Sequence, residues 1–133
     1  MTSTPIPHVL PDPPVNPENQ RYFDAAARGE LLVGKCESCS AFHFYPRTLC
    51  PFCFSDRIDW VPARGTGTVY TYSTMHRGAP TPYTIAYVTL DEGITMLTNL
   101  VDCDPASIRI GQAVKVVFRT SASGVSVPCF APA

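Results

Sequence analysis

The sequence predicts a mainly β protein in which an N-terminal helix and a small four-cysteine ribbon are followed by a five-stranded barrel. Two observations lead to this fold class: two Cys-x-x-Cys pairs are separated by ten residues, and five short, alternating apolar runs follow them. The composition, 45% hydrophobic and 16% charged in 133 residues, is that of a folded chain rather than a disordered one. We divide the chain into a proline-rich arm (1–16), the helix and ribbon (17–61) and the barrel (62–133).

The first two segments are an extended arm and a short helix. Prolines crowd the first 17 residues, a pattern that favours an extended and poorly ordered arm. Residues 18–28 follow a good helix cap at Asn16 and precede Gly29, which can end a helix. Tyr22 and Phe23 lie on the apolar face of this helix. A helix so short needs a surface to lie on, and we expect a partner to supply part of it.

The ribbon segment carries the most specific motif of the chain. Short strands are expected at 31–33 and 42–45, and each Cys-x-x-Cys turn can point two thiolates at one ion. Four thiolates complete a tetrahedron and leave no open position, so the metal is expected to be structural. Zinc is the favoured ion, rubredoxin-type iron stays open, and two disulfides or four free thiols are the alternatives. The expected metal ligands are Cys36, Cys39, Cys50 and Cys53.

The second half of the chain reads as a small all-β unit. Five short runs alternate apolar and polar residues, and a possible helical turn at 102–108 falls between the third and the fourth. This is the layout of a Greek-key OB-fold barrel, whose closure hides the strand edges; an open five-stranded meander is the alternative. The runs are 66–74, 83–90, 94–101, 114–119 and 125–130.

Charge and motifs exclude several function classes. The formal net charge of -1, with only two lysines, gives no general attraction for a polyanion. The chain has no phosphate-binding loop, nucleophile elbow or dinucleotide fingerprint, and its histidines (His8, His43, His76) show no spacing with a carboxylate. An independent enzyme is therefore poorly supported. Cys103 and Cys129 are expected to be buried free thiols.

The location expected from the sequence is the cytoplasm. There is no apolar run of about 18 residues and no secretory signal pattern at the N-terminus, so neither a membrane span nor export is expected. Paired Cys-x-x-Cys spacing without a signal also favours a reducing compartment and a metal over disulfides.

The order of several modest motifs carries a family likeness. Gly29-Glu30-Leu31 precedes the first cysteine pair, Phe44-Tyr45-Pro46-Arg47 lies between the pairs, and Gly65-Thr66-Gly67-Thr68-Val69 opens the barrel. Over about residues 17–130 the chain resembles the rubredoxin-like zinc-ribbon plus OB-fold family of acyl-CoA-associated accessory proteins. The resemblance implies a non-catalytic subunit that binds and stabilises a thiolase-like aldolase or thiolase, or a hot-dog-fold hydratase, as in steroid side-chain degradation. The chemistry would then belong to the partner.

Two sets of residues fit this role. The ribbon has more aromatic rings than it can bury, so some are expected to meet a partner. Arginines that flank the junction of ribbon and barrel in sequence are candidates for contacts with CoA phosphates. The candidate docking residues are Tyr22, Phe23, Phe42, Phe44, Tyr45 and Phe52, and the candidate CoA contacts are Arg47, Arg64 and Arg77.

Two other functions remain as alternatives. Zinc ribbons and OB barrels also bind single-stranded nucleic acid, and Tyr70, Tyr72, Tyr83 and Tyr87 could stack on bases, although the low positive charge argues against it. An iron electron carrier is the third hypothesis.

Overall fold

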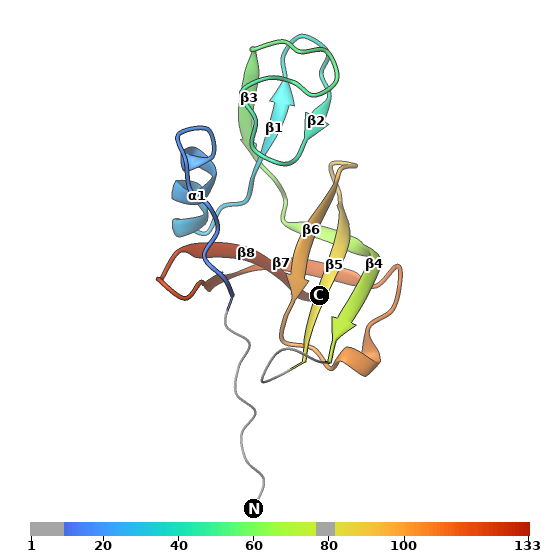
Figure 1. The fold of residues 1–133 in the computed structure, drawn as a ribbon. Helices are drawn as coiled ribbons and strands as arrows, with labels where there is room; N and C mark the ends of the chain where they lie inside the picture. The colour runs from blue at the N-terminus through green and yellow to red at the C-terminus, as the bar shows by residue number, and fades with distance from the viewer. Residues whose placement is uncertain (1–9, 77–81) are drawn as a thin grey trace, which may run out of the picture.

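The computed structural model describes residues 10–76 and 82–133; it shows a small ribbon standing on a closed barrel, with one helix beside them (Figure 1). The predicted mainly β fold is confirmed. His8 and Arg77, singled out above, lie outside the described residues. Among the described residues, no helical segment has the length and hydrophobicity that a membrane crossing requires. The elements are α1 (Gln20–Ala27), β1 (Leu32–Cys36), β2 (Phe42–His43), β3 (Ile58–Pro62), β4 (Thr66–Met75), β5 (Tyr83–Leu90), β6 (Thr95–Leu100), the 3-10 helix η1 (Pro105–Ser107), β7 (Ala113–Thr120) and β8 (Ser126–Pro132).

Helix α1 ends where the sequence predicts. The Glu30 N–H donates to the Ala25 carbonyl (2.9 Å) and the Gly29 N–H to the Ala26 carbonyl (3.0 Å). These two bonds form a Schellman motif, which places Gly29 at φ +79°, a conformation that glycine adopts without steric cost.

The start of α1 is later than predicted. The Asn16 N–H donates to Asn19 Oδ1 (2.8 Å), and the Asn19 N–H donates to Asn16 Oδ1 (3.1 Å). This reciprocal pair resembles a capping box and closes a separate turn, so the regular helix begins only at Gln20.

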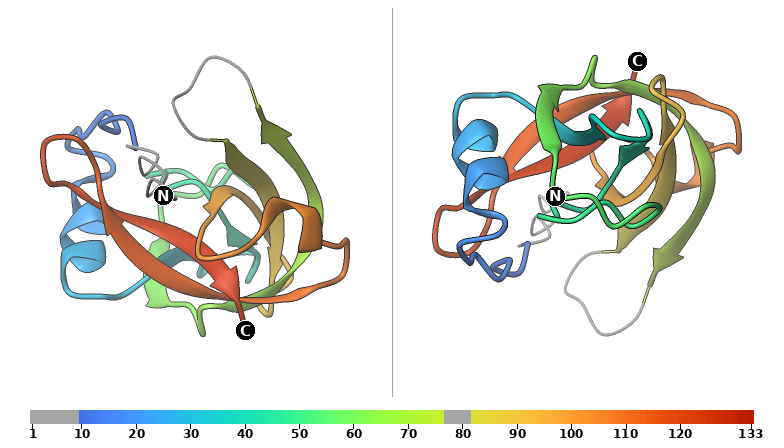
Figure 2. Two further views of the ribbon diagram at one scale, coloured as in Figure 1. Left: turned by 90° about the horizontal axis from the view of Figure 1, so that it is seen from below. Right: turned by 90° about the horizontal axis from the view of Figure 1, so that it is seen from above.

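The apolar face of α1 lies on the chain's own barrel. Figure 2 shows α1 beside β8, and the Ser126 hydroxyl of β8 donates to the Ala26 carbonyl (3.0 Å). Tyr22 and Phe23 are buried in this contact together with the two alanines that follow. The barrel thus removes most of both rings from water, but each ring also lines a groove at the surface, so a role of Tyr22 and Phe23 in docking a partner stays a prediction.

The ribbon is a three-stranded sheet of order β2-β1-β3. Strand β3 was not predicted; it pairs antiparallel with β1 from Leu32 opposite Pro62 to Cys36 opposite Ile58. The predicted strand at 42–45 is shorter than expected, since β2 holds only two residues. The central strand β1 therefore carries the first metal ligand at its end and is supported on both sides.

Gly34 and His43 face each other where β1 pairs with β2. His43 is buried, and neither ring nitrogen is hydrogen-bonded within the described part of the chain. Burial, and then the nearby Arg47 charge, lower the pKa of His43, so its ring is neutral at pH 7. A Cβ on Gly34 would run into the imidazole, so this position in β1 requires glycine.

The five predicted runs of the second half all form barrel strands. Their order is β4-β5-β6-β8-β7, closed by the pairing of β4 with β7, which confirms the Greek-key OB barrel and excludes the open meander. The predicted first and last residues of these strands differ from the observed ones by at most two positions. The predicted helical turn is η1, between β6 and β7. Strands β6 and β8 run parallel and pair only at Leu100 and Phe130.

One continuous apolar core joins the barrel to α1 and the ribbon. Inside the barrel, Val69, Val88 and Phe130 are almost fully buried. The same cluster continues through Tyr22 of α1 to Val33 of β1. Because buried side chains of the ribbon and the barrel belong to one cluster, the core fixes how the two parts lie against each other.

The last part of the arm is held on the barrel. The Asp12 carboxylate accepts hydrogen bonds from the Ser121 hydroxyl (2.6 Å) and from the hydroxyl and N–H of Ser123 (2.8 and 3.0 Å). These hydrogen bonds hold the pKa of Asp12 below its usual value, and the bond from Ser121 contributes most. Leu10 is buried, and its carbonyl accepts from the Ala122 N–H. The expected poor order of the arm is thus corrected for residues 10–16.

Replacing Gly34 by alanine is predicted to destabilise the ribbon by about 1–3 kcal/mol, because the new methyl group must displace the buried His43 ring. Urea unfolding of the metal-loaded protein measures the change. The same substitution in a His43→Ala background should cost less, and an equal cost in both backgrounds would show that the two side chains do not compete for space.

Candidate metal centre and the neighbouring groove

The structure brings the four cysteine sulfur atoms of the ribbon together, all within 4.8 Å of one another. The Cys36 and Cys53 Sγ atoms are 3.5 Å apart, and those of Cys39 and Cys50 are 3.7 Å apart. Four sulfur atoms placed at about 2.3 Å around one ion would be separated by about 3.8 Å. The distances therefore fit a tetrahedral metal rather than disulfides, and the four thiols are indeed unbridged.

The two Cys-x-x-Cys turns have the same backbone geometry. The N–H of Ser40 donates to the Cys36 carbonyl, and the N–H of Phe54 donates to the Cys50 carbonyl, both at 2.9 Å. Ser40 and Phe54 also share a left-handed conformation, at φ 64° and 63°. This repetition gives each turn the same shape, and each turn contributes two sulfur atoms to the same cluster.

Backbone N–H groups prepare two of these sulfurs to be thiolates. The Cys39 N–H donates to the Cys36 Sγ at 3.4 Å. This bond contributes most among the hydrogen bonds that lower the pKa of Cys36 to about 6. Burial of Cys50 disfavours its thiolate, but the N–H groups of Cys53 and Phe52 outweigh burial and hold its pKa below the ordinary value. At Cys39 and Cys53 a backbone hydrogen bond lowers the pKa, but the neighbouring sulfurs and burial outweigh it and raise the pKa of both thiols. A bound cation would offset this effect of the neighbouring sulfurs, which fits a site whose thiols lose their protons when the metal binds.

A metal held here is structural. All four tetrahedral positions are filled by sulfur, so no position is open to a substrate. Cys36 and Cys50 are buried while Cys39 and Cys53 are exposed, which places the ion near the surface of the ribbon. The ion would hold the cysteine turns, which lie beyond the apolar core that the ribbon shares with the barrel.

The second cysteine turn presents apolar side chains to solvent. Phe52 is 66% exposed and Phe54 is 76% exposed, and Leu49 beside them is also exposed. We call these three residues the knuckle tip. The tip lies on a turn that the metal would hold rigid, away from the barrel.

The other ribbon aromatics form the junction with α1 and the barrel. The Phe44 and Tyr45 rings lie 5.7 and 5.8 Å from the Tyr22 ring, and the Asn19 amide donates to the Tyr45 hydroxyl (3.2 Å). Phe44 and Phe42 are half-buried and pack on the core. Of the candidate docking residues, the structure thus leaves Phe52 and part of Tyr45 on the surface.

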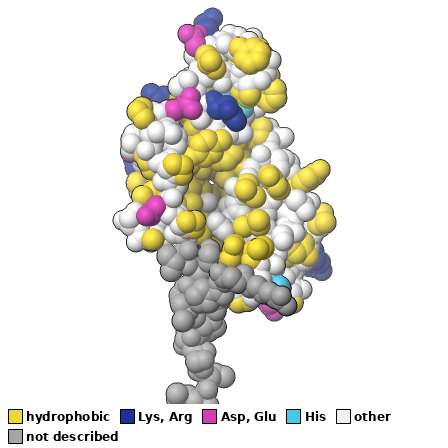
Figure 3. All heavy atoms as spheres, in the orientation of Figure 1, with side chains coloured by type: hydrophobic (Ala, Val, Ile, Leu, Met, Phe, Trp, Pro, Cys, Tyr) yellow, Lys and Arg dark blue, Asp and Glu magenta, His cyan; other side chains and the backbone are white. Residues whose placement is uncertain are grey.

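A groove of about 450 Å³ opens at this junction. Its walls are α1 with Tyr22 and Phe23, the ribbon with Tyr45 and Arg47, and the outer side of β6 with Leu97. In Figure 3, hydrophobic side chains gather in a hollow between α1 and β6, below the ribbon. The groove exists because β6 and β8 pair only at one end and diverge along the rest of their length.

The candidate CoA-contacting arginines lie in different surroundings. Arg47 is exposed on the groove and takes part in no ion pair among the described residues. Arg64 lies on the connection from β3 to β4, where its backbone N–H donates to the Glu92 carboxylate (2.9 Å). The structure thus brings only Arg47 of the described pair to the groove.

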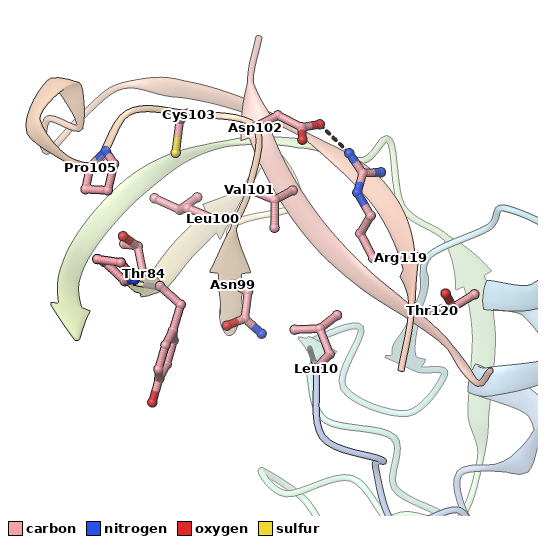
Figure 4. Close-up of a pocket in the computed structure, with 12 residues that line it drawn as sticks. Leu10, Thr84, Asn99, Leu100, Val101, Asp102, Cys103, Pro105, Arg119 and Thr120 are labelled. Atoms are coloured by element: carbon pink, nitrogen blue, oxygen red, sulfur yellow. Dashed lines mark hydrogen bonds and ion pairs between the residues drawn. The ribbon is translucent and has the colours of Figure 1, made fainter. Parts of the chain in front are cut away.

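A second cavity, of about 500 Å³, lies at the opposite end of β6. Figure 4 shows Cys103 on its wall and the ion pair of Asp102 with Arg119 beside it. Burial, followed by the charges of two aspartates, raises the pKa of Cys103, and burial raises that of Cys129 to about 11. Both thiols are therefore protonated at neutral pH. Cys129 is buried as expected, whereas Cys103 is only half-buried, because its side chain lies on the wall of the cavity.

The purified chain is predicted to carry one metal ion per molecule, measured by elemental analysis. Cys39→Ser and Cys53→Ser should lose the ion, because three sulfurs no longer complete the tetrahedron. Cys103→Ser is the matched control and should retain it. Metal that stays bound in both ribbon variants would rule out the four-sulfur site.

Two families match consecutive parts of this chain. Residues 23–59 match the family described as "ChsH2, rubredoxin-like zinc ribbon domain", and residues 60–119 match "ChsH2, C-terminal OB-fold domain". The two matched segments meet between Asp59 and Trp60, inside β3.

Curated relatives carry names of subunits and scaffolds. A "Probable enoyl-CoA hydratase alpha subunit" of Thermomonospora curvata is 35% identical over 127 residues, which are 92% of this chain but only 40% of that protein. A "DUF35 domain-containing scaffold protein" of Methanothermobacter thermautotrophicus is 36% identical over 100 residues, 69% of this chain and 74% of that protein.

A solved structure agrees with these relatives. The structure described as "Ltp2-ChsH2(DUF35) aldolase" superposes with a TM-score of 0.80 at 34% identity, covering 91% of this chain and 98% of that one. The resemblance drawn from the order of motifs is thereby confirmed: the chain belongs to the ChsH2-type family of zinc-ribbon and OB-fold proteins, also named DUF35.

Proposed function

We propose that this chain is a non-catalytic accessory subunit of an acyl-CoA-processing complex, and that it binds and stabilises a thiolase-like aldolase or thiolase. The observation that carries the proposal is the likeness over 91% of the chain to a structure described as an Ltp2-ChsH2 aldolase. The relative named as a hydratase subunit supports an acyl-CoA enzyme as partner, with a hot-dog-fold hydratase as the second kind.

The metal in this proposal is zinc, with a mechanical role. Four thiolates in a tetrahedron suit zinc, which has no redox chemistry of its own, and the ion would hold the two cysteine turns together. Iron would fit the same sulfurs, and the elemental analysis above distinguishes the two.

The knuckle tip supports a docking role for the ribbon. Phe52, the candidate docking residue that is most exposed, lies there with two further apolar side chains that have no cover within the described chain. Large rings on a rigid turn lose little conformational freedom on binding, which is typical of residues that dominate protein interfaces. Tyr45 at the edge of the groove would extend the contact.

We also propose that Arg47 and Arg64 contact CoA phosphates where the partner's substrate channel passes this chain. Arg47 supports this role because its guanidinium is exposed on the groove and is not held by a carboxylate. A guanidinium makes paired hydrogen bonds to phosphate oxygens, so one such contact would help to orient the CoA group.

Co-expression with the thiolase-like enzyme of the same organism tests the main proposal. The two chains are expected to co-elute as a heteromer, and the enzyme alone should have lower yield and a lower melting temperature. Phe52→Ala combined with Phe54→Ala should weaken the heteromer at least tenfold, a loss typical of exposed aromatic anchors. Full activity and unchanged melting of the enzyme without this chain would contradict an accessory role.

Arg47→Ala is predicted to leave the heteromer intact and to raise KM for acyl-CoA about tenfold, as expected when one charge-assisted hydrogen bond to phosphate is lost. Arg64→Ala should act in the same direction. Arg57→Ala, which removes an exposed ribbon arginine paired with Glu37 at 3.6 Å, is the control and should leave KM unchanged. If Arg47→Ala and Arg64→Ala also leave KM for acyl-CoA unchanged, these arginines do not contact CoA.

A further inference from the structure

The outer face of one half of the barrel carries no charge. Strands β4, β5 and β6, of 10, 8 and 6 residues, contain no Asp, Glu, Lys or Arg. Exposed sheet faces normally carry charged side chains, which keep them soluble and separate. An uncharged face on three neighbouring strands is therefore unusual for a surface that stays in water.

Apolar side chains project from the middle of this face. Tyr87 of β5 lies directly opposite Leu97 of β6, and they are 46% and 52% exposed. On the neighbouring strand β4, Thr71 pairs with Tyr87, and Tyr70 at the bulge before it is also exposed. Paired strand residues point to the same side, so Tyr87 and Leu97 make one patch, which we call the sheet patch.

The sheet patch continues into the junction groove. Tyr87 and Leu97 belong to the patch and also line the groove, whose other walls are α1 and the ribbon. Hydrophobic side chains thus lie on the barrel beside the hollow (Figure 3), and those of Tyr87 and Leu97 reach its wall. Apolar side chains beside a hollow fit a partner surface with a projecting apolar element.

We infer that the sheet patch and the floor of the groove form a docking surface for the partner enzyme, which inserts an uncharged, apolar segment between the ribbon and β6. The inference rests on the proposed function, and it names the surface of the barrel that the partner would contact. The absence of charge on β4 to β6 requires a partner segment that is also uncharged, since an unpaired charge would be buried against the patch. Arg47 remains at the rim, outside the apolar floor.

A second copy of this chain fits the surface poorly. In a two-fold contact the same patch would face itself, and the hollow of about 450 Å³ on each copy would meet another hollow rather than a projection. Such voids forfeit the contacts that stabilise an interface. Single-stranded nucleic acid fits poorly as well, because stacking tyrosines require cations nearby and these strands have none.

Affinity between the chain and its co-expressed thiolase-like enzyme tests the inference. Leu97→Asp should weaken binding about 30-fold or more, because it buries a carboxylate in the patch. Leu97→Thr introduces a β-branched residue, which strands favour, and removes apolar area from the patch, so it should weaken binding in the same direction without a folding defect. Ile110→Asp, at a residue that is 71% exposed and does not line the groove, is the matched control and should bind as the wild type.

The outcomes separate this inference from the proposed function. If the wild type binds the enzyme and both Leu97 variants bind equally well, the docking surface is wrong while the accessory role stands. If the wild type does not bind, the accessory role fails and the inference fails with it. A chain that is dimeric alone and becomes monomeric with Leu97→Asp would identify a second copy as the occupant. If the wild type shifts single-stranded RNA in a gel and Tyr87→Ala does not, nucleic acid is the occupant. Either of these two results would overturn the inference.

Discussion

The tetrahedral cluster of four sulfur atoms is the constraint on which the ribbon depends. Strands β1, β2 and β3 are short, and β2 has only two residues, so hydrogen bonds alone cannot hold them. The two cysteine turns repeat one backbone geometry and aim their sulfurs at one point. A metal at that point fixes the second turn relative to β1, and with it the knuckle tip, Tyr45 and Arg47.

The ribbon in turn shapes the junction. Tyr22 is the central side chain there: it is buried in the core of the barrel and also contacts the Phe44 and Tyr45 rings of the ribbon. Helix α1 thus joins the two parts, and the groove is the space left between α1, the ribbon and β6. Its shape depends on the metal through the ribbon and on the divergence of β6 and β8 through the barrel.

Much of this arrangement was predictable from the sequence. The cysteine spacing predicted the metal cluster, because two Cys-x-x-Cys turns are enough to supply all four ligands of a tetrahedral site. The barrel strands were predictable because each alternates apolar and polar residues between clear turns. Strand β3 was missed because it is short, does not alternate cleanly and contains Asp59 and Pro62, which disfavour strands; it forms because β1 offers it an edge.

Other features depend on contacts that a sequence does not display. Tyr22 and Phe23 were expected to face a partner, since nothing in the helix shows that β8 would cover them. The left-handed conformations of Ser40 and Phe54 have no sequence signal, because neither residue is glycine. The uncharged strands β4 to β6, in contrast, are visible in the sequence, but only the barrel shows that Tyr87 and Leu97 lie together on its outside.

Amide hydrogen exchange of the metal-loaded and the metal-stripped chain tests most directly whether the metal holds the ribbon against an independently stable barrel. Removal of the ion should abolish protection in β1, β2 and β3 and leave strands β4 to β8 protected, because the barrel is closed by its own hydrogen bonds. Ribbon protection that survives removal of the metal would contradict this account, and so would loss of protection throughout the barrel.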